Sequence, residues 1–168
     1  MKALGLIDRL VGTASGALAC AGAVAIVLLM LHIVVDVTGR YLFNHPFPGT
    51  LESVTYYYMV MVTALPFAYV TRVQGQIAVE MFTSWLPGRW VHLIDAAAGL
   101  LMLAYVGVLA WKMAQEAVAM TVLEEVHDAG TMQFITWPSR WIPPVALGVM
   151  ALAVAIRIIE DAKGFLRT

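Results

Sequence analysis

The sequence predicts an all-α integral membrane protein in which four helices form one bundle, so that residues 1–168 make a single membrane domain. Hydrophobic residues account for 61% of the chain and charged residues for 12%, and the mean hydropathy is +0.83. Soluble domains are about half apolar and a quarter charged. A bilayer core of ~30 Å requires about twenty apolar helical residues. Segments at about 12–38, 51–71, 91–124 and 141–159 meet or approach that length.

The first two predicted spans contain residues that affect helix packing. Gly12, Gly16 and Ala19 place small side chains on one stripe of the first span, which permits close backbone contact. Pro66 removes an amide donor from the second span and predicts a kink there. Thr63 is placed to help satisfy the backbone around this proline. The stripe of small residues predicts core packing within the bundle.

The third predicted span is longer than a bilayer requires. Between Val91 and Glu124 the chain has no proline, and Gly99 and Gly107 are only weak breakers. At 1.5 Å per residue one helix over this segment would be on the order of 50 Å long. It must therefore tilt or project from the membrane. The fourth span is uncharged over residues 141–156.

Two segments outside the spans are predicted to lie in the membrane interface. The connection 73–87, between the second and third spans, mixes apolar with polar residues in the way of a short interfacial helix. Pro87 and Gly88 would end this helix. At the N-terminus, apolar residues recur at helical spacing at Leu4, Ile7 and Val11, which suits an interfacial lead-in to the first span.

Basic residues predict that both termini are cytoplasmic, because short cytoplasmic segments carry the excess of Lys and Arg. Arg40 and Arg140 fall on the opposite side, together with an acidic loop that contains Glu124, Glu125 and Asp128. The basic residues on the predicted cytoplasmic side are Lys2, Arg9, Arg72, Arg89, Arg157, Lys163 and Arg167.

Charged residues cluster at the turn between the first and second spans. Asp36 and Arg40 lie one helical turn apart, so we expect an ion pair that neutralises both and places Arg40 near the negative end of the helix. Alternatively, Arg40 anchors the turn against Glu52 or against a partner subunit. Glu52 follows Thr50, which can cap the second helix, and a carboxylate suits the first turn of a helix.

Lys112 and Glu116 form the deepest candidate ion pair of the sequence, again spaced i,i+4 in the third span. We expect them to neutralise each other, because ionisable groups inside a bilayer are costly. A proton or sodium route would require several inward-facing polar groups, and the fourth span offers none between Ile142 and Ile156. Transport through this chain alone is therefore not expected.

Composition and motifs exclude several other classes of protein. A net charge of -1 and a pI near 6.4 provide no basic surface for nucleic acid. His32 and His92 lie at different depths, so they make a poor axial pair for haem, and His45 and His127 lie in turns without further metal ligands nearby. No motif of an enzyme active site is present, and we expect neither catalysis nor a cofactor.

The turn and the exit of the second span carry a motif that resembles the small membrane subunit, of DctQ type, of tripartite ATP-independent periplasmic (TRAP) transporters. That family has an Arg-Tyr-aromatic-Phe-Asn-x-Pro turn, an acidic residue opening the next helix, and a basic-Gly-polar-hydrophobic-x-acidic exit. The matching residues here are Arg40, Tyr41, Phe43, Asn44, Pro46, Glu52, Arg72, Gly75, Ile77 and Glu80.

The resemblance implies a multi-pass protein of the bacterial inner membrane that works without catalysis. Its implied partners are a large multi-spanning subunit that moves an organic acid with sodium, a periplasmic solute-binding protein that docks transiently, and membrane lipid. On this hypothesis Asp36, Arg40, Asn44, Pro46, Glu52, Arg72, Gly75 and Glu80 shape turns or contact the partner, and none of them binds solute. The alternative is a membrane anchor of a respiratory or oxidoreductase complex.

Overall fold

The computed structural model describes residues 2–44, 48–74, 88–128 and 133–167, and within them the prediction of four helices long and apolar enough to span a membrane is confirmed. Four helical segments are long and apolar enough to cross a bilayer, namely Gly5–Phe43, Thr50–Val73, Leu93–Val122 and Trp137–Ile159. Each overlaps one of the predicted spans. The first extends further than expected at both ends.

Single helices make up three of the spans, and several shorter helices make up the other. Helix α1 covers Lys2–Phe43, α6 covers Gly88–Val122 and α7 covers Ile142–Arg167. A short 3-10 helix, η2 (Trp137–Trp141), leads into α7. The second span consists of α2 (Thr50–Ser53), the π-helix η1 (Val54–Tyr58), α3 (Met59–Ala64) and α4 (Phe67–Gln74).

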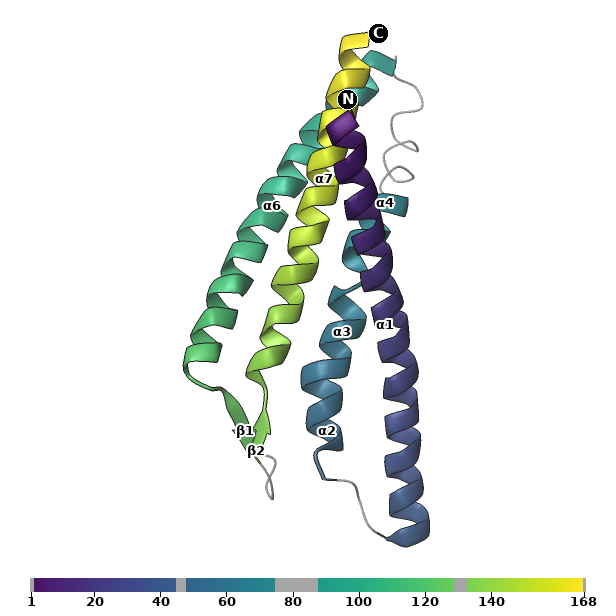
Figure 1. The fold of residues 1–168 in the computed structure, drawn as a ribbon, viewed down its shortest axis with the longest axis vertical. Coiled ribbons are helices and arrows are strands. Elements are labelled where there is room, and N and C mark those ends of the chain that lie inside the picture. The colour runs from purple at the N-terminus through teal and green to yellow at the C-terminus, as the bar shows by residue number, and fades with distance from the viewer. Residues whose placement is uncertain (1, 45–47, 75–87, 129–132, 168) are drawn as a thin grey trace.

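The helices form a layer in which they lie close together at one end of the molecule and diverge towards the other (Figure 1). Helix α7 contacts α6, α4, α3 and α1, whereas α6 has its main contacts with α7 and η2. Both termini lie at the same end of the molecule. A small apolar core of Val11, Ala153 and Ile156, with Val149 against it, joins α1 to α7 near the terminal end. The predicted bundle is therefore open rather than closed.

Helix α1 is continuous from Lys2, so the predicted N-terminal lead-in belongs to the same helix as the first span. Its 42 residues correspond to about 63 Å at 1.5 Å per residue, which is longer than a bilayer core is thick. The helix ends at Phe43, and Asn44 follows with a left-handed φ of 51°. Asparagine tolerates this conformation better than most residues, which explains why it suits the position after a helix.

Helix α6 ends in a Schellman motif. The amide of Glu124 donates to the carbonyl of Thr121 (3.2 Å), and the amide of Glu125 donates to the carbonyl of Met120 (3.0 Å). Glu124 has a φ of 48°, the left-handed conformation that this motif requires. The chain then turns into a hairpin of β1 (Val126–Asp128) and β2 (Gln133–Ile135), antiparallel with His127 opposite Phe134. The predicted acidic loop is thus partly a β-hairpin.

Pro66 interrupts the second span as predicted, between α3 and α4. The hydroxyl of Thr63 donates to the carbonyl of Met59 at 2.8 Å, one turn back, so it does not bond the carbonyl that the proline leaves free at Val62. A Cβ built on Gly22 of α1 would lie 3.2 Å from the Pro66 ring. Gly22 therefore allows α1 to approach the second span at its break.

The glycines of the first and third spans pack against neighbours only in part. A Cβ on Gly99 of α6 would lie 2.7 Å from Cγ1 of Ile158 in α7, so this glycine is needed for the contact between the two helices. A Cβ on Gly12 would meet the guanidinium of Arg72 at 3.3 Å. Gly16 and Gly107 have no atom within 4 Å of the corresponding point. Close helix contact therefore uses Gly12, Gly22 and Gly99.

Several predictions fall outside the described residues. The interfacial segment is expected over 73–87, of which the structure describes only Val73 and Gln74, the last residues of α4. His45, Pro46, Gly75 and Glu80 lie outside the described ranges as well.

A pair of glycine substitutions tests the contact between α6 and α7. Gly99→Ala should destabilise the fold, because its new methyl group would overlap Ile158, and overpacking of this kind costs about 1–3 kcal/mol. Gly107→Ala adds the same methyl group in open space and should gain about 1 kcal/mol in helix propensity. Thermal unfolding in detergent, followed by tryptophan fluorescence, measures both. Equal melting temperatures for the two variants would contradict the packing.

Candidate functional site at the hairpin end

Three consecutive tyrosines of η1 connect the second span to other elements. The hydroxyl of Tyr56 lies 3.2 Å from Nδ1 of His127 in β1, and the hydroxyl of Tyr57 donates to the carbonyl of Ile135 in β2 at 2.9 Å. Tyr58 points the other way. Its ring meets His32 of α1 edge to face, with centroids 5.7 Å apart. One helical segment thereby contacts both the hairpin and the first span.

The start of the second span also packs against the hairpin. Phe134 of β2 meets the ring of Tyr57 edge to face, with centroids 5.8 Å apart. Gly49 precedes α2 with a φ of 83°, and a Cβ at this position would lie 3.7 Å from the Phe134 ring. Gly49 rather than Thr50 occupies the N-cap, so the predicted capping by Thr50 is wrong, since Thr50 is itself the first helical residue.

An ion pair closes the base of the hairpin. Arg140 of η2 donates to both carboxylate oxygens of Glu125, from Nε at 3.1 Å and from the terminal nitrogen at 2.8 Å. The carbonyl of Glu125 accepts the amide and the hydroxyl of Thr136, and the hydroxyl of Ser139 donates to the carbonyl of Thr136. Thr136 and Ser139 are buried. Two-point Arg–carboxylate bonding fixes orientation as well as distance.

The hydrogen bonds from Arg140 lower the pKa of Glu125 below its ordinary value of 4.5, against the opposing effect of partial burial. Nearby, the indole of Trp141 donates to the hydroxyl of Thr121 in α6 at 3.0 Å. Tryptophan favours the boundary between membrane and water. The bond lies at the end of the apolar segment Leu93–Val122 of α6.

The predicted pairing of Asp36 with Arg40 forms. The carboxylate of Asp36 and the guanidinium of Arg40 are 2.8 Å apart, with Asp36 buried and Arg40 exposed. Glu52 lies in the first turn of α2, where a carboxylate opposes the positive helix end, and it is half-buried. A direct pair of Arg40 with Glu52 is not among the ion pairs of the described residues.

Arg72 has a partner that the sequence did not identify. At the opposite end of the molecule its guanidinium contacts both the carboxylate of Asp8 (2.8 Å) and the carbonyl of the same residue (3.1 Å). Asp8 and Arg72 are 64 positions apart, so neither helical spacing nor a local motif indicates the contact. The bond ties the end of the second span that lies near the termini to the start of α1.

Lys112 and Glu116 do not form the expected pair. The ion pairs among the described residues are Asp36–Arg40, Asp8–Arg72 and Glu125–Arg140. Glu116 lines a cavity of about 220 Å³ with Tyr56 and Arg140, and its negative charge attracts the guanidinium of Arg140. Both Lys112 and Glu116 are exposed on this chain. Their spacing permits a pair, but the structure directs Glu116 elsewhere.

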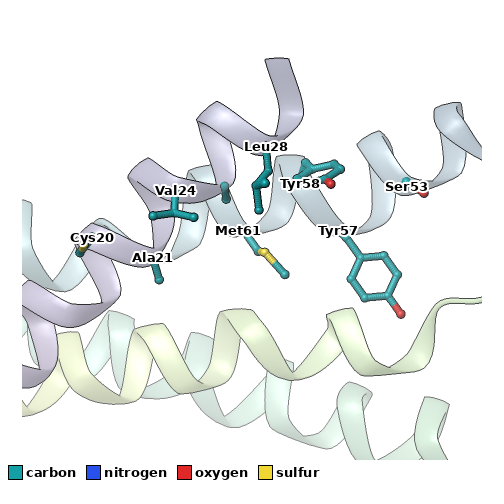
Figure 2. Close-up of a pocket in the computed structure, with 9 residues that line it drawn as sticks. Cys20, Ala21, Val24, Leu28, Ser53, Tyr57, Tyr58 and Met61 are labelled. Atoms are coloured by element: carbon teal, nitrogen blue, oxygen red, sulfur yellow. The ribbon is translucent and has the colours of Figure 1, made fainter. Parts of the chain in front are cut away.

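A larger cleft lies within the membrane-spanning region (Figure 2). It has a volume of about 570 Å³ and lies between α1 and the second span. Helix α1 lines it with Ala21, Val24 and Leu28, and the second span lines it with Tyr58 and Met61. The lining is mostly apolar, so the cleft suits a hydrocarbon or an apolar side chain rather than a polar solute.

The described residues offer little for metal or redox chemistry. No group of three or more His, Cys, Asp or Glu residues is placed to hold a metal ion in the described ranges. His32, on α1, instead contacts Tyr58 of η1, and His127, on the hairpin, contacts Tyr56 of η1. The arrangement at the hairpin end can hold helices together and can present a polar surface.

The Glu125–Arg140 pair predicts a dependence of stability on pH. Because the folded pKa of Glu125 lies below its ordinary value, the pair stabilises the fold above that value, and the effect is lost as the pH falls through the lowered pKa. Between about pH 6 and pH 3, the melting temperature of the wild type should fall more than that of Glu125→Gln. Since both side chains are partly exposed, the difference should be small. Parallel curves would contradict it.

The comparisons with known proteins identify a family. A family model described as tripartite ATP-independent periplasmic transporters, DctQ component, matches residues 29–164. No curated protein and no solved structure matches the chain. The matched range covers most of the chain and includes the turn after α1, the tyrosines of η1 and the hairpin end. The chain therefore belongs to the DctQ family, the small permease component of TRAP transporters.

Proposed function

We propose that this chain is a scaffold subunit that holds still the large membrane subunit of a TRAP transporter. In this proposal the large subunit moves an organic acid together with sodium, a periplasmic protein delivers the solute, and the present chain binds neither. The chain is placed in the bacterial inner membrane with both termini in the cytoplasm. This orientation follows from the excess of basic residues at the terminal end.

The observation that carries the proposal is how little of each span the chain buries by itself. In the most apolar window of α6 only 6% of the residues are buried, and the corresponding share for the best-covered span, at α7, is 28%. Large apolar side chains such as Leu101, Tyr105 and Val108 are exposed. An open layer of this kind offers a broad apolar surface to another membrane protein.

The distribution of charge also supports a scaffold role. The three ion pairs of the described residues lie at the ends of the spans, with Asp8–Arg72 near the termini and Asp36–Arg40 and Glu125–Arg140 at the hairpin end. Between them the described helices are mostly apolar. A substrate route needs polar groups along the membrane, and we assign that route to the large subunit.

A scaffold must resist deformation while its partner moves. Rigid-body motion of one part against another is the usual basis of alternating access. The contacts of η1 with the hairpin and with His32 fix the helices at one end. The Asp8–Arg72 pair fixes them at the other end. A frame connected at both ends suits the task of keeping the large subunit in place.

Purification of the complex tests the proposal. The chain is tagged at its C-terminus, co-expressed with the large subunit and extracted in a mild detergent, and the product is examined by mass spectrometry and a visible absorption scan. Recovery of the large subunit without a haem band supports the scaffold. A haem band or redox subunits would instead favour the oxidoreductase anchor. Reconstitution with the binding protein, with and without a sodium gradient, then measures uptake of organic acids.

Replacement of Arg40 separates a structural role from a partner contact. Arg40→Gln removes the charge that pairs with buried Asp36, so recovery of the large subunit and uptake should both fall several-fold. The matched control is the double variant Asp36→Asn with Arg40→Gln, which removes both charges. Its melting temperature should return towards that of the wild type.

The two readouts of the double variant decide between the roles. If the melting temperature is restored but recovery of the large subunit stays low, Arg40 contacts the partner. Recovery that returns with the melting temperature assigns Arg40 to the turn alone. Unchanged assembly in Arg40→Gln together with an altered substrate preference would contradict the whole assignment.

A further inference from the structure

We infer that the outward face of α6 around Lys112 and Gln115 docks against a transmembrane helix of the large subunit that carries a carboxylate opposite Lys112. The inference rests on the proposed function. Both side chains are exposed on this chain, and α6 has its main contacts with α7 and η2. In Figure 1, α6 forms one edge of the layer.

The periodicity of α6 shows that this face points away from the rest of the chain. Val106 and Ala117 are buried and mark the side that meets α7. At about 100° per residue, Gln115 lies opposite that side, and Lys112 lies well away from it. Neighbouring apolar residues on the outward face, Tyr105 and Val108, are 67% and 64% exposed. Polar and apolar residues together form one surface that this chain leaves uncovered.

The depth of Lys112 makes lipid an unsuitable neighbour. Thr121 lies at the end of the apolar segment Leu93–Val122 and bonds Trp141, a residue type that favours the membrane boundary. Lys112 lies nine positions before Thr121, which is about 14 Å along the helix. A lysine near a helix end can extend its ammonium group to the boundary, but an ionisable group this far inside usually faces protein or water.

Charge determines which occupant fits the face. Lys112 is absent from the ion pairs of the described residues, and Glu116 lies in the cavity beside Arg140. A carboxylate on the partner helix would therefore complete the pairing. A second copy of this chain fits less well, because a two-fold axis along this face would place Lys112 near its own copy, and like charges repel. The family supplies a large membrane subunit as the partner.

Site-specific photo-crosslinking tests the face directly. A benzophenone amino acid is placed at Val108 or Gln115 of α6 and, as a matched control, at Val27 or Val34, which are similarly exposed on α1. Membranes that contain both subunits, each with its own tag, are irradiated and blotted. Adducts with the large subunit from Val108 and Gln115 support the inference. Adducts with a second copy, with lipid alone or from α1 only would overturn it.

Substitutions at Lys112 supply a second readout. Lys112→Leu should weaken the association with the large subunit about ten-fold, which corresponds to the 1–2 kcal/mol of a polar contact between membrane helices, whereas Lys112→Arg should retain it. Val118→Leu, on the other flank of α6, serves as the control. If Lys112 faced lipid, leucine would leave the association unchanged or strengthen it, and the inference would fail.

The outcomes separate this inference from the proposed function. If the wild-type chain recovers no large subunit, the proposed function itself fails. If the large subunit is recovered but the α6 positions give no adduct with it, only the assignment of the face fails.

Discussion

The fold depends on one constraint, which is that a chain with so few charged groups must neutralise them at the ends of its spans. Asp8 with Arg72 does so near the termini, and Glu125 with Arg140 does so at the hairpin end. The first pair joins helices 64 positions apart along the chain, and the second joins the two ends of the hairpin. The same bonds that remove charge from the apolar region therefore also hold the helices in the layer. The same ion pairs therefore lower the free-energy cost of placing charged residues in a bilayer and stabilise the fold.

How far the sequence predicts these contacts depends on whether they are local. Asp36 and Arg40 are one turn apart in one helix, so spacing alone predicted their pairing, which forms. Lys112 and Glu116 have the same spacing, yet tertiary structure places Glu116 in the cavity beside Arg140. The bond of Arg72 to Asp8 joins elements that only the fold brings together. The length of the apolar segments likewise predicted the spans, while the hairpin and the π-helix depend on contacts between elements.

The π-helix η1 is the segment through which the second span contacts several neighbours. In an α-helix, successive residues point about 100° apart, and in η1 Tyr56 and Tyr57 meet the hairpin while Tyr58 meets α1. Each hydroxyl has a partner, as expected for a tyrosine whose ring is covered and whose polar end lies near water. The π-turn is therefore part of the connection between the first span and the hairpin. Segments of this kind often mark functional positions in helices.

An open layer has a consequence for the partner as well as for this chain. In a closed bundle the helices would cover one another, and the remaining surface would be uniformly apolar, with nothing to distinguish one face from the next. Here α6 lies at an edge and presents Lys112 and Gln115 outward at membrane depth. Apolar contact supplies area without direction, whereas a single buried charge specifies both orientation and partner. Such a residue would allow a scaffold to select one face of one large subunit among many membrane proteins.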